Sequence, residues 1–265
     1  MTTTEPTEKI PPSAEYVQSL ARGLAVIRCF NQQNQRRTLS DVARATDLSR
    51  ATARRFLLTL AEVGYVATDG STFWLTPRVL ELGYSYLSSL SLPEIAQSHL
   101  EKLSHQVHES SSVSILDGSE IVYVARVAVS RLMTVGITIG TRLPAYATSM
   151  GRVLLAGLPD DELDSYLETV DIQRLTEHTI ATHDDLRAAI LKARADGICM
   201  LDQELEAGLR SMAVPIRNPS GLTVAAVNIS TPAARYSLAE LHSDLIPALR
   251  ATAADIEQDL AIVNH

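Results

Sequence analysis

The chain has 265 residues, of which 46% are hydrophobic, enough for one large soluble domain or two moderate ones. No apolar run approaches the eighteen or so residues of a membrane-spanning helix, and no signal peptide pattern is visible, so we expect a cytoplasmic protein without membrane association. The net charge of −8 argues against a generic nucleic-acid binder. Cys29 and Cys199 lie far apart in apolar stretches, which argues against a disulfide or a metal site.

The charge is unevenly distributed. Residues 15–76 carry a net charge of +3, whereas the residues after Thr76 carry −10. A basic module joined to an acidic one is expected when only one end of a protein meets DNA. Residues 1–14 are rich in Thr, Pro and Glu and have no apolar period, so we expect a disordered tail there.

Helical periodicity begins at Tyr16. An apolar stripe predicts a first helix over residues 15–30 that packs behind the next two helices, and its members are Val17, Leu20, Leu24, Ile27 and Phe30.

The stretch from Thr38 to Leu60 predicts two short helices joined by a tight turn. We expect Ser40 to cap the first helix and Ser49 the second, because a serine hydroxyl accepts hydrogen bonds from the free N–H groups of a first turn. On the second helix, four apolar residues at i, i+3, i+4 and i+7 share one face: Ala53, Phe56, Leu57 and Leu60. Its start and opposite face carry Arg50, Ala51, Thr52, Arg54 and Arg55.

An apolar back and a basic front suit a helix that enters the major groove of DNA; the alternative is a helical hairpin with a solvated arginine face. The following residues favour DNA binding. Asp69-Gly70 separates two runs rich in aromatic and β-branched residues, which is a strong hairpin signal. The pattern therefore predicts a winged helix-turn-helix, and the expected DNA contacts are Ser40, Ser49, Arg50, Ala51, Thr52, Arg54, Arg55, Asp69 and Gly70.

A linker helix is predicted over residues 77–91, with Thr76 as its cap and proline at the first helical position. This helix is apolar on more than one face, which indicates that it and the first helix bury surface in a dimer. Ser91 and Glu94 form a capping box for a helix that ends near Val107. We place the domain boundary in this linker, between a DNA-binding module of residues 15–76 and a second module of residues 92–263.

Strands are predicted after Ser110. Residues 112–127 indicate a hairpin, residues 132–139 a further strand and residues 142–144 a break in the pattern. Helices are expected at residues 148–155, 160–167 and 184–195, strands at 198–201, 212–216 and 222–229, and a closing helix, capped by Ser237, at 238–260. Helices at both ends of a mainly antiparallel sheet give an α+β fold.

Six segments in order resemble blocks of IclR-type transcriptional regulators, and they are YVQSLARGLAVI, TLSDVARATDLSRATARRFLLTLAEVGYV, TPRVLELGYSYLSSLSL, LPAYATSMGRVLLAGLP, DQELEAGLRSMAVPI and AAVNISTPAARYS. The resemblance covers residues 16–262. Parts of it are similar to the branch that regulates protocatechuate, 4-hydroxybenzoate and β-ketoadipate catabolism. It implies an N-terminal winged helix, a C-terminal GAF-like effector-binding domain, dimers through the DNA-binding module and often tetramers.

Carried over by position, the effector pocket of this family falls on Thr148-Ser149-Met150, Leu201-Asp202, Ser211 and Asn228-Ile229-Ser230. Free N–H groups at Ser149, Met150 and Gly151, at the start of a helix, would favour an anion. Asn228 and Ser230 alternate with apolar residues on a strand and so face one way; the alternative is a polar network that serves only the fold. The expected apolar floor is Leu201, Met133 and Tyr146.

We therefore expect a regulator without catalysis, cofactor or metal. Its partners would be operator DNA, a second copy or a tetramer, RNA polymerase if it activates, and a small organic acid, either an aromatic acid or a keto-diacid, held without an arginine clamp. His99, His105 and His108 are weighed as metal ligands, but a solvated face is favoured. Two other classes stay open: an enzyme or carrier acting on an aromatic carboxylate, and a protein-interaction adaptor.

Overall fold

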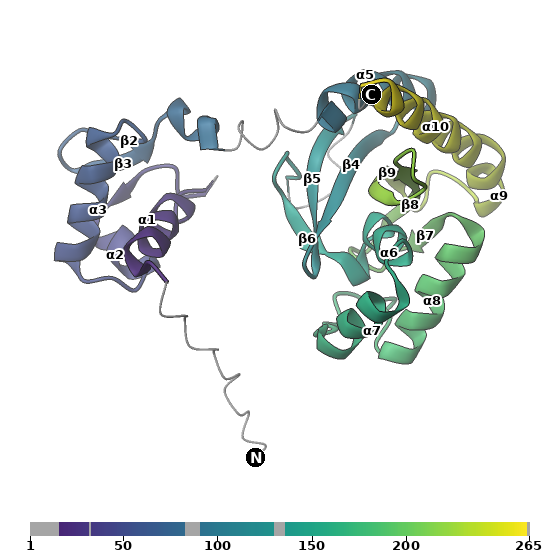
Figure 1. Ribbon diagram of the computed structural model, residues 1–265, viewed down its shortest axis with the longest axis horizontal. Coiled ribbons are helices and arrows are strands. Elements are labelled where there is room, and N and C mark those ends of the chain that lie inside the picture. Colours follow the sequence, from purple (N-terminus) through teal and green to yellow (C-terminus); the bar gives the residue numbers. More distant parts are fainter. Residues whose placement is uncertain (1–15, 32, 83–90, 130–135, 264–265) are drawn as a thin grey trace, which may run out of the picture. The chain divides into compact units, whose positions relative to one another are not determined.

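The computed structural model describes residues 16–31, 33–82, 91–129 and 136–263 (Figure 1). The chain divides into two compact units, Met1–Tyr86 and Leu87–His265. Within the described ranges, no helix has the length and apolar character needed to cross a membrane.

The first unit is a winged helix-turn-helix, as predicted. A three-stranded antiparallel sheet in the order β1-β3-β2 packs with three helices around a core that includes Val26, Val42, Leu57 and Phe73. Its elements are α1 (Gln18–Arg28), β1 (Arg37–Thr38), α2 (Leu39–Ala45), α3 (Arg50–Glu62), β2 (Val66–Thr68), β3 (Thr72–Leu75) and the 3-10 turn η1 (Pro77–Val79). The predicted hairpin around Asp69-Gly70 is confirmed, because β2 pairs with β3.

The cap of α2 differs from the prediction. Thr38, not Ser40, precedes the helix, and its hydroxyl accepts from the N–H of Asp41 at 3.3 Å. The Asp41 carboxylate in turn accepts from the N–H of Thr38 at 3.2 Å, which completes a capping box. Ser40 therefore lies within the first turn of α2. Thr38 is the better cap because Asp41, three residues later, accepts from the N–H of Thr38, a bond that a cap at Ser40 would lack.

The predicted apolar stripe on α1 is also partly wrong. Val17, Leu20 and Leu24 are exposed, with Leu20 at 63%, while Val26 is fully buried in the core. The helix therefore turns a different face toward α3 than the periodicity indicated, and it leaves an apolar surface uncovered within this unit.

The predicted linker helix at 77–91 can be followed only at its ends. Thr76 accepts a hydrogen bond from the N–H of Arg78 and Pro77 occupies the first helical position, as expected. Residues 83–90 lie outside the described residues. So does the side chain of Ser91, on which the predicted capping box depends.

The second unit contains a six-stranded antiparallel sheet in the order β6-β5-β4-β9-β8-β7. Its strands are β4 (Ser110–Asp117), β5 (Glu120–Val127), β6 (Arg142–Pro144), β7 (Cys199–Asp202), β8 (Leu209–Arg217) and β9 (Thr223–Pro232). Its helices are α5 (Ser91–Val107), the 3-10 turn η2 (Ala145–Ala147), α6 (Ser149–Ala156), α7 (Asp160–Thr169), α8 (His183–Asp196), α9 (Leu238–Glu240) and α10 (Ile246–Val263). The mainly antiparallel, α+β character predicted for this module is confirmed.

Three details of this unit depart from the predictions. Residues 142–144 form an edge strand paired with β5 rather than a break, and proline is tolerated there because an edge strand needs fewer N–H donors. Residues 136–139 are not a strand, and residues 132–135 lie outside the described part. The closing helix, which Ser237 caps as expected, includes a π-helical segment, η3 (Leu241–Leu245), between α9 and α10.

Helices cover both faces of the sheet (Figure 1), and each face has its own core. Helices α5 and α10 cover one face, where Val113, Met212 and Ile229 are buried. Helices α6, α7 and α8 belong to the other face, where Tyr123, Leu201 and the α6 residue Met150 are buried. Because side chains alternate along a strand, the strand register decides which residues reach the α6 face.

Candidate DNA-binding and effector sites

The helix predicted to read DNA presents a free basic surface. Ser49 caps α3 by accepting from the N–H of Thr52 at 3.2 Å, as expected. Ala53 and Leu57 are buried, whereas Arg50, Ala51, Arg54 and Arg55 are exposed. No carboxylate among the described residues pairs with these three arginines. Their charges are therefore available to an external anion.

The tip of the wing is organised by Asp69. Its carboxylate accepts hydrogen bonds from the N–H groups of Ser71 at 2.9 Å and Thr72 at 2.7 Å, and from both of their hydroxyls. These bonds hold the pKa of Asp69 well below its usual range. The Asp69 carboxylate is thus committed to its own turn, and Gly70 supplies the positive φ of 92° that the turn requires.

Arg36 supplies positive charge beside this turn. Its guanidinium lies 3.8 Å from the centre of the Trp74 ring, and its Nη1 lies 3.3 Å from Asp69. Cation–π stacking of this kind orients a guanidinium. No pattern in the sequence singled out Arg36, so this wing arginine was missed.

In the second unit, two rows of directly paired residues cross the α6 face of the sheet. The first row contains Leu201, Ser211, Ser230 and Ser110, one from each of β7, β8, β9 and β4. The second row contains Ala213, Asn228, Ser112 and Arg126. We call the polar members of these rows, together with Ser114, the polar face: Ser110, Ser112, Ser114, Arg126, Ser211, Asn228 and Ser230.

Three of the predicted effector residues, Ser211, Asn228 and Ser230, therefore lie together. Asn228 is 4% exposed and donates from Nδ2 to the Ser230 hydroxyl at 3.0 Å. Its Oδ1 is buried and has no hydrogen-bond partner among the described residues. A buried amide oxygen without a partner carries a desolvation cost, so this face is incomplete as it stands.

The N-terminus of α6 closes over the same face, since α6 packs against β4, β7, β8 and β9. Thr148 caps the helix and takes the N–H of Gly151 at 3.0 Å, so Gly151 has no N–H group to offer a ligand. A Cβ on Gly151 would lie 2.2 Å from the carbonyl oxygen of Ala145, which explains the glycine by packing. The N–H groups of Ser149 and Met150 have no acceptor among the described residues.

A β-bulge brings an arginine to this face. Val113 pairs with Ala125, but Ser114 pairs with Tyr123, so Val124 is an extra residue in β5. Tyr123 and Arg126 are three residues apart and would face opposite sides of a regular strand; the bulge directs both toward α6. A regular alternation along β5 would have placed Arg126 on the opposite face, so the sequence did not indicate it. The expectation of a pocket without an arginine was wrong for this face.

Arg126 is held in place by a hydrogen bond, and it forms no ion pair with any residue that the structure describes. Its Nη1 donates to the Ser112 hydroxyl at 2.9 Å, while its Nε is buried without a partner among the described residues. Burial lowers the pKa of Arg126 below its ordinary value. The neighbouring Tyr123 supplies no negative charge, because burial raises its pKa to about 12.

The remaining predicted effector residues are placed differently. Asp202 points away from the polar face, since it neighbours Leu201 on the strand, and it forms an ion pair with Arg210 at 2.8 Å. Tyr146 is buried, and its hydroxyl donates to the carbonyl oxygen of Gln173 at 3.0 Å. Met133 lies outside the described residues.

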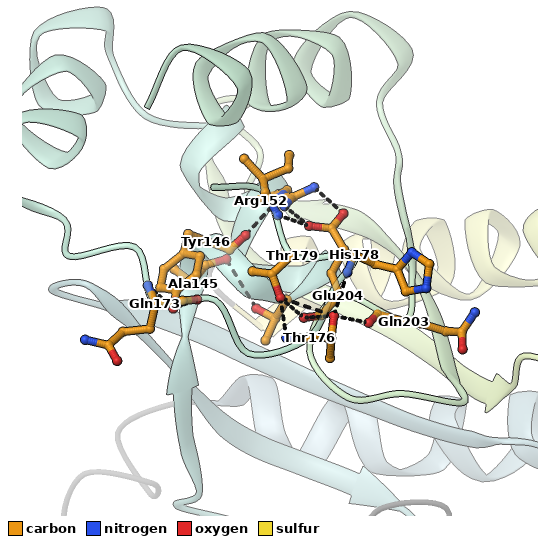
Figure 2. A network of polar contacts seen from close by, with 11 residues as sticks. Ala145, Tyr146, Arg152, Gln173, Thr176, His178, Thr179, Gln203 and Glu204 are labelled. Atoms are coloured by element: carbon orange, nitrogen blue, oxygen red, sulfur yellow. Dashed lines mark hydrogen bonds and ion pairs between the residues drawn. The ribbon is translucent and has the colours of Figure 1, made fainter. Parts of the chain in front are cut away.

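A second arginine, Arg152 on α6 itself, forms hydrogen bonds through all three of its side-chain nitrogens. Figure 2 shows Arg152 with both terminal nitrogens on the carboxylate of Glu204, at 2.9 and 2.5 Å, and its Nε bonded to the carbonyl oxygen of Tyr146. Thr179 donates to the backbone carbonyl of Glu204 at 2.7 Å. Arg152 therefore fixes the loop that follows β7, and its charge is already neutralised by Glu204.

The three histidines weighed as metal ligands do not form a metal site among the described residues. The expected solvated face is wrong for His99, which is buried and lies 2.8 Å from Asp259 of α10. His105 and His108 are exposed, and their rings are 6.2 Å apart. The described residues contain no group of three or more His, Cys, Asp or Glu side chains able to hold a metal. Burial raises the pKa of the Cys199 thiol to about 12, so it stays protonated.

A winged helix-turn-helix joined to an α+β sensory unit with a polar, incomplete sheet face defines a class of ligand-responsive transcriptional regulators. Residues 19–70 match the IclR helix-turn-helix domain, and residues 84–258 match the bacterial transcriptional regulator IclR C-terminal domain. The chain therefore belongs to the IclR family of transcriptional regulators.

Its relatives place it in one branch of that family. The chain is 44% identical to the Pca regulon regulatory protein of Pseudomonas putida over 91% of its own length and 84% of that protein. It is 39% identical to the p-hydroxybenzoate hydroxylase transcriptional activator of Acinetobacter baylyi, over 91% of both chains. A crystal structure of an IclR homolog from Microbacterium hydrocarbonoxydans, complexed with 4-hydroxybenzoate, has a TM-score of 0.82 at 26% identity and covers 91% of this chain and 98% of that one.

Proposed function

We propose that this regulator binds operator DNA as a homodimer in the cytoplasm and changes its DNA binding when a small aromatic acid occupies the polar face. Residues at the start and exposed side of α3 contact the operator: Ser49, Arg50, Ala51, Thr52, Arg54 and Arg55. The support for this set is the row of exposed arginines, which pair with no carboxylate in the described part of the chain, above a buried apolar back.

The observation that carries the effector proposal is the buried Oδ1 of Asn228, which lacks a partner among the described residues. It lies in a polar cluster between α6 and the sheet, where a ligand would supply the missing donor. Two relatives are named for the Pca regulon and for p-hydroxybenzoate hydroxylase, and the homolog of known structure holds 4-hydroxybenzoate. Aromatic acids are thus the first class to test.

The dimer is proposed from uncovered apolar surface. Val17, just before α1, is exposed, as are Leu20 and Leu24 on that helix. Leu80 and Leu82 after η1 are exposed as well, with Leu80 at 70%. Patches of this kind mark interaction surfaces. A second copy would bury them and let two recognition helices read two half-sites, which one helix-turn-helix is too small to do specifically.

The decisive experiment measures binding of the purified protein to DNA from upstream of its own gene, with and without 4-hydroxybenzoate, protocatechuate and β-ketoadipate. Fluorescence anisotropy should show specific binding that an aromatic acid alters. Asn228→Leu should bind DNA without responding to the acid, because the leucine removes the amide. A protein that binds this DNA no better than unrelated DNA, or that responds to none of the acids, would contradict the proposal.

A further inference from the structure

The polar face contains one guanidinium group, that of Arg126, whose charge no carboxylate among the described residues neutralises. Arg126 forms no ion pair with a carboxylate among the described residues, and residues 130–135, which follow β5, include no Asp or Glu. A half-buried cation without an acid is unfavourable, because burial removes water without supplying a counter-charge. Because Arg126 is unfavourable for folding in this position, we expect it to have a functional role.

The position of Arg126 is fixed in advance. Ser112, itself fully buried, accepts from Nη1 at 2.9 Å, and the bulge at Val124 sets the direction of the side chain. The other terminal nitrogen and Nε have no acceptor among the described residues, and Nε is buried. Two parallel N–H donors on one edge of a guanidinium match the two oxygens of a carboxylate.

The other arginine near this face, Arg152, already pairs with a carboxylate and is not available to bind a second one. Both terminal nitrogens of Arg152 bond to Glu204, and its Nε bonds to Tyr146 (Figure 2). The N-terminus of α6 offers N–H groups from Ser149 and Met150 but no full positive charge. Arg126 is therefore the cationic donor that the described residues leave open on the α6 face.

We infer that Arg126 is the carboxylate anchor of the effector site, a preformed receptor whose charge stays uncompensated until an organic acid binds. The inference rests on the proposed effector site and adds the group that selects an acid over a neutral molecule of the same shape. The carboxylate accepts from the Arg126 guanidinium, and the rest of the ligand extends over β9 toward Asn228. The carboxylate of the ligand thus supplies the negative charge that Arg126 lacks.

Thermal unfolding of the full-length protein tests this inference with four ligands: 4-hydroxybenzoate, protocatechuate, β-ketoadipate and the neutral 4-hydroxybenzamide. At least one acid should raise the Tm of the wild type, and the benzamide should not. Arg126→Met should lose the shift, with an affinity lower by about 30-fold or more, because one partner of a buried charge pair is gone. Its Tm without ligand should equal or exceed that of the wild type, because removing an uncompensated buried charge relieves a cost.

The matched control is Arg142→Met, which removes the same charge from the neighbouring strand β6. Arg142 is exposed and paired with Asp117 and Glu120, so this variant should respond as the wild type does. Arg126→Lys, which keeps the charge and loses the fork, should respond more weakly, and it keeps the test open if the methionine variant does not fold.

Two results separate the inference from the proposed function. A wild type that responds to an acid, together with an Arg126→Met variant that responds equally, overturns the anchor and leaves the effector site standing. An equal shift by 4-hydroxybenzamide also overturns it. A wild type that responds to none of the acids removes the effector site and the anchor together.

Discussion

Arg152 and Glu204 form a bidentate ion pair inside the second unit, called the effector unit below, with side chains only 3% and 13% exposed. Removing one partner leaves a buried charge unpaired, so Arg152→Met should lower the free energy of unfolding by about 3–5 kcal/mol. Urea unfolding followed by circular dichroism measures this loss. The double replacement of Arg152 and Glu204 by methionine should recover much of it; equal stability of the single variant and the wild type would show that the pair is not structurally required.

Arg50 and Arg54 should both contribute to operator affinity. An arginine that reads a base edge contributes about 1–3 kcal/mol, and its alanine variant should lose preference at one operator position. An arginine that contacts only phosphate should weaken binding to all sequences and flatten the salt dependence. Anisotropy titrations at several salt concentrations distinguish the two. Arg187→Ala, which removes an equal charge from the effector unit, should bind normally; unchanged affinity in both α3 variants would contradict the assignment.

The wing should be insensitive to pH until strongly acidic conditions. The folded-state pKa of Asp69 is depressed by hydrogen bonds from Ser71 and Thr72, so its contribution is present above the unfolded-state pKa of about 3.9. That contribution is lost as the pH falls toward the folded value. Between pH 7 and pH 3, Asp69→Asn should therefore lose less stability than the wild type. Denaturant unfolding at each pH checks this, and parallel curves for the two proteins would exclude the role of the carboxylate.

A charge on the exposed side of α1 should weaken the proposed dimer. Leu20→Glu places a carboxylate on the apolar surface that a second copy would cover, so the sedimentation profile should shift toward monomer. Leu222→Glu is the matched control, since Leu222 is equally exposed at 63% but lies in the effector unit. If Leu20→Glu sediments like the wild type at the same micromolar concentration, α1 is not part of the interface.

Much of this architecture was predictable because its signals are local. The N-cap at Ser49, the apolar back of α3 and the hairpin at Asp69-Gly70 each depend on residues a few positions apart, and all are confirmed. One local signal, the N-cap of α2, was ambiguous. Thr38 and Ser40 are both good caps, and the reciprocal bond with Asp41 decides between them.

The candidate site was predictable only in part, because its completion depends on strand register. Asn228, Ser230 and Ser211 were found through alternation and through the resemblance, and pairing of β8 with β9 brings them together. Arg126 was missed because the extra residue at Val124 reverses the alternation of β5, and a bulge is a property of two strands rather than one. The inward or outward direction of Asp202 likewise follows from pairing with Arg210.

The polar face lies on the α6 side of the sheet, and this placement has a consequence for how such regulators diversify. The residues buried against α5 and α10 hold the fold, whereas those facing α6 include the groups proposed to choose the ligand. A substitution on the α6 face can therefore change what is sensed while the opposite core continues to stabilise the sheet. Inherited changes in specificity, or those selected in the laboratory for a new inducer, should accumulate on one side of β4, β8 and β9.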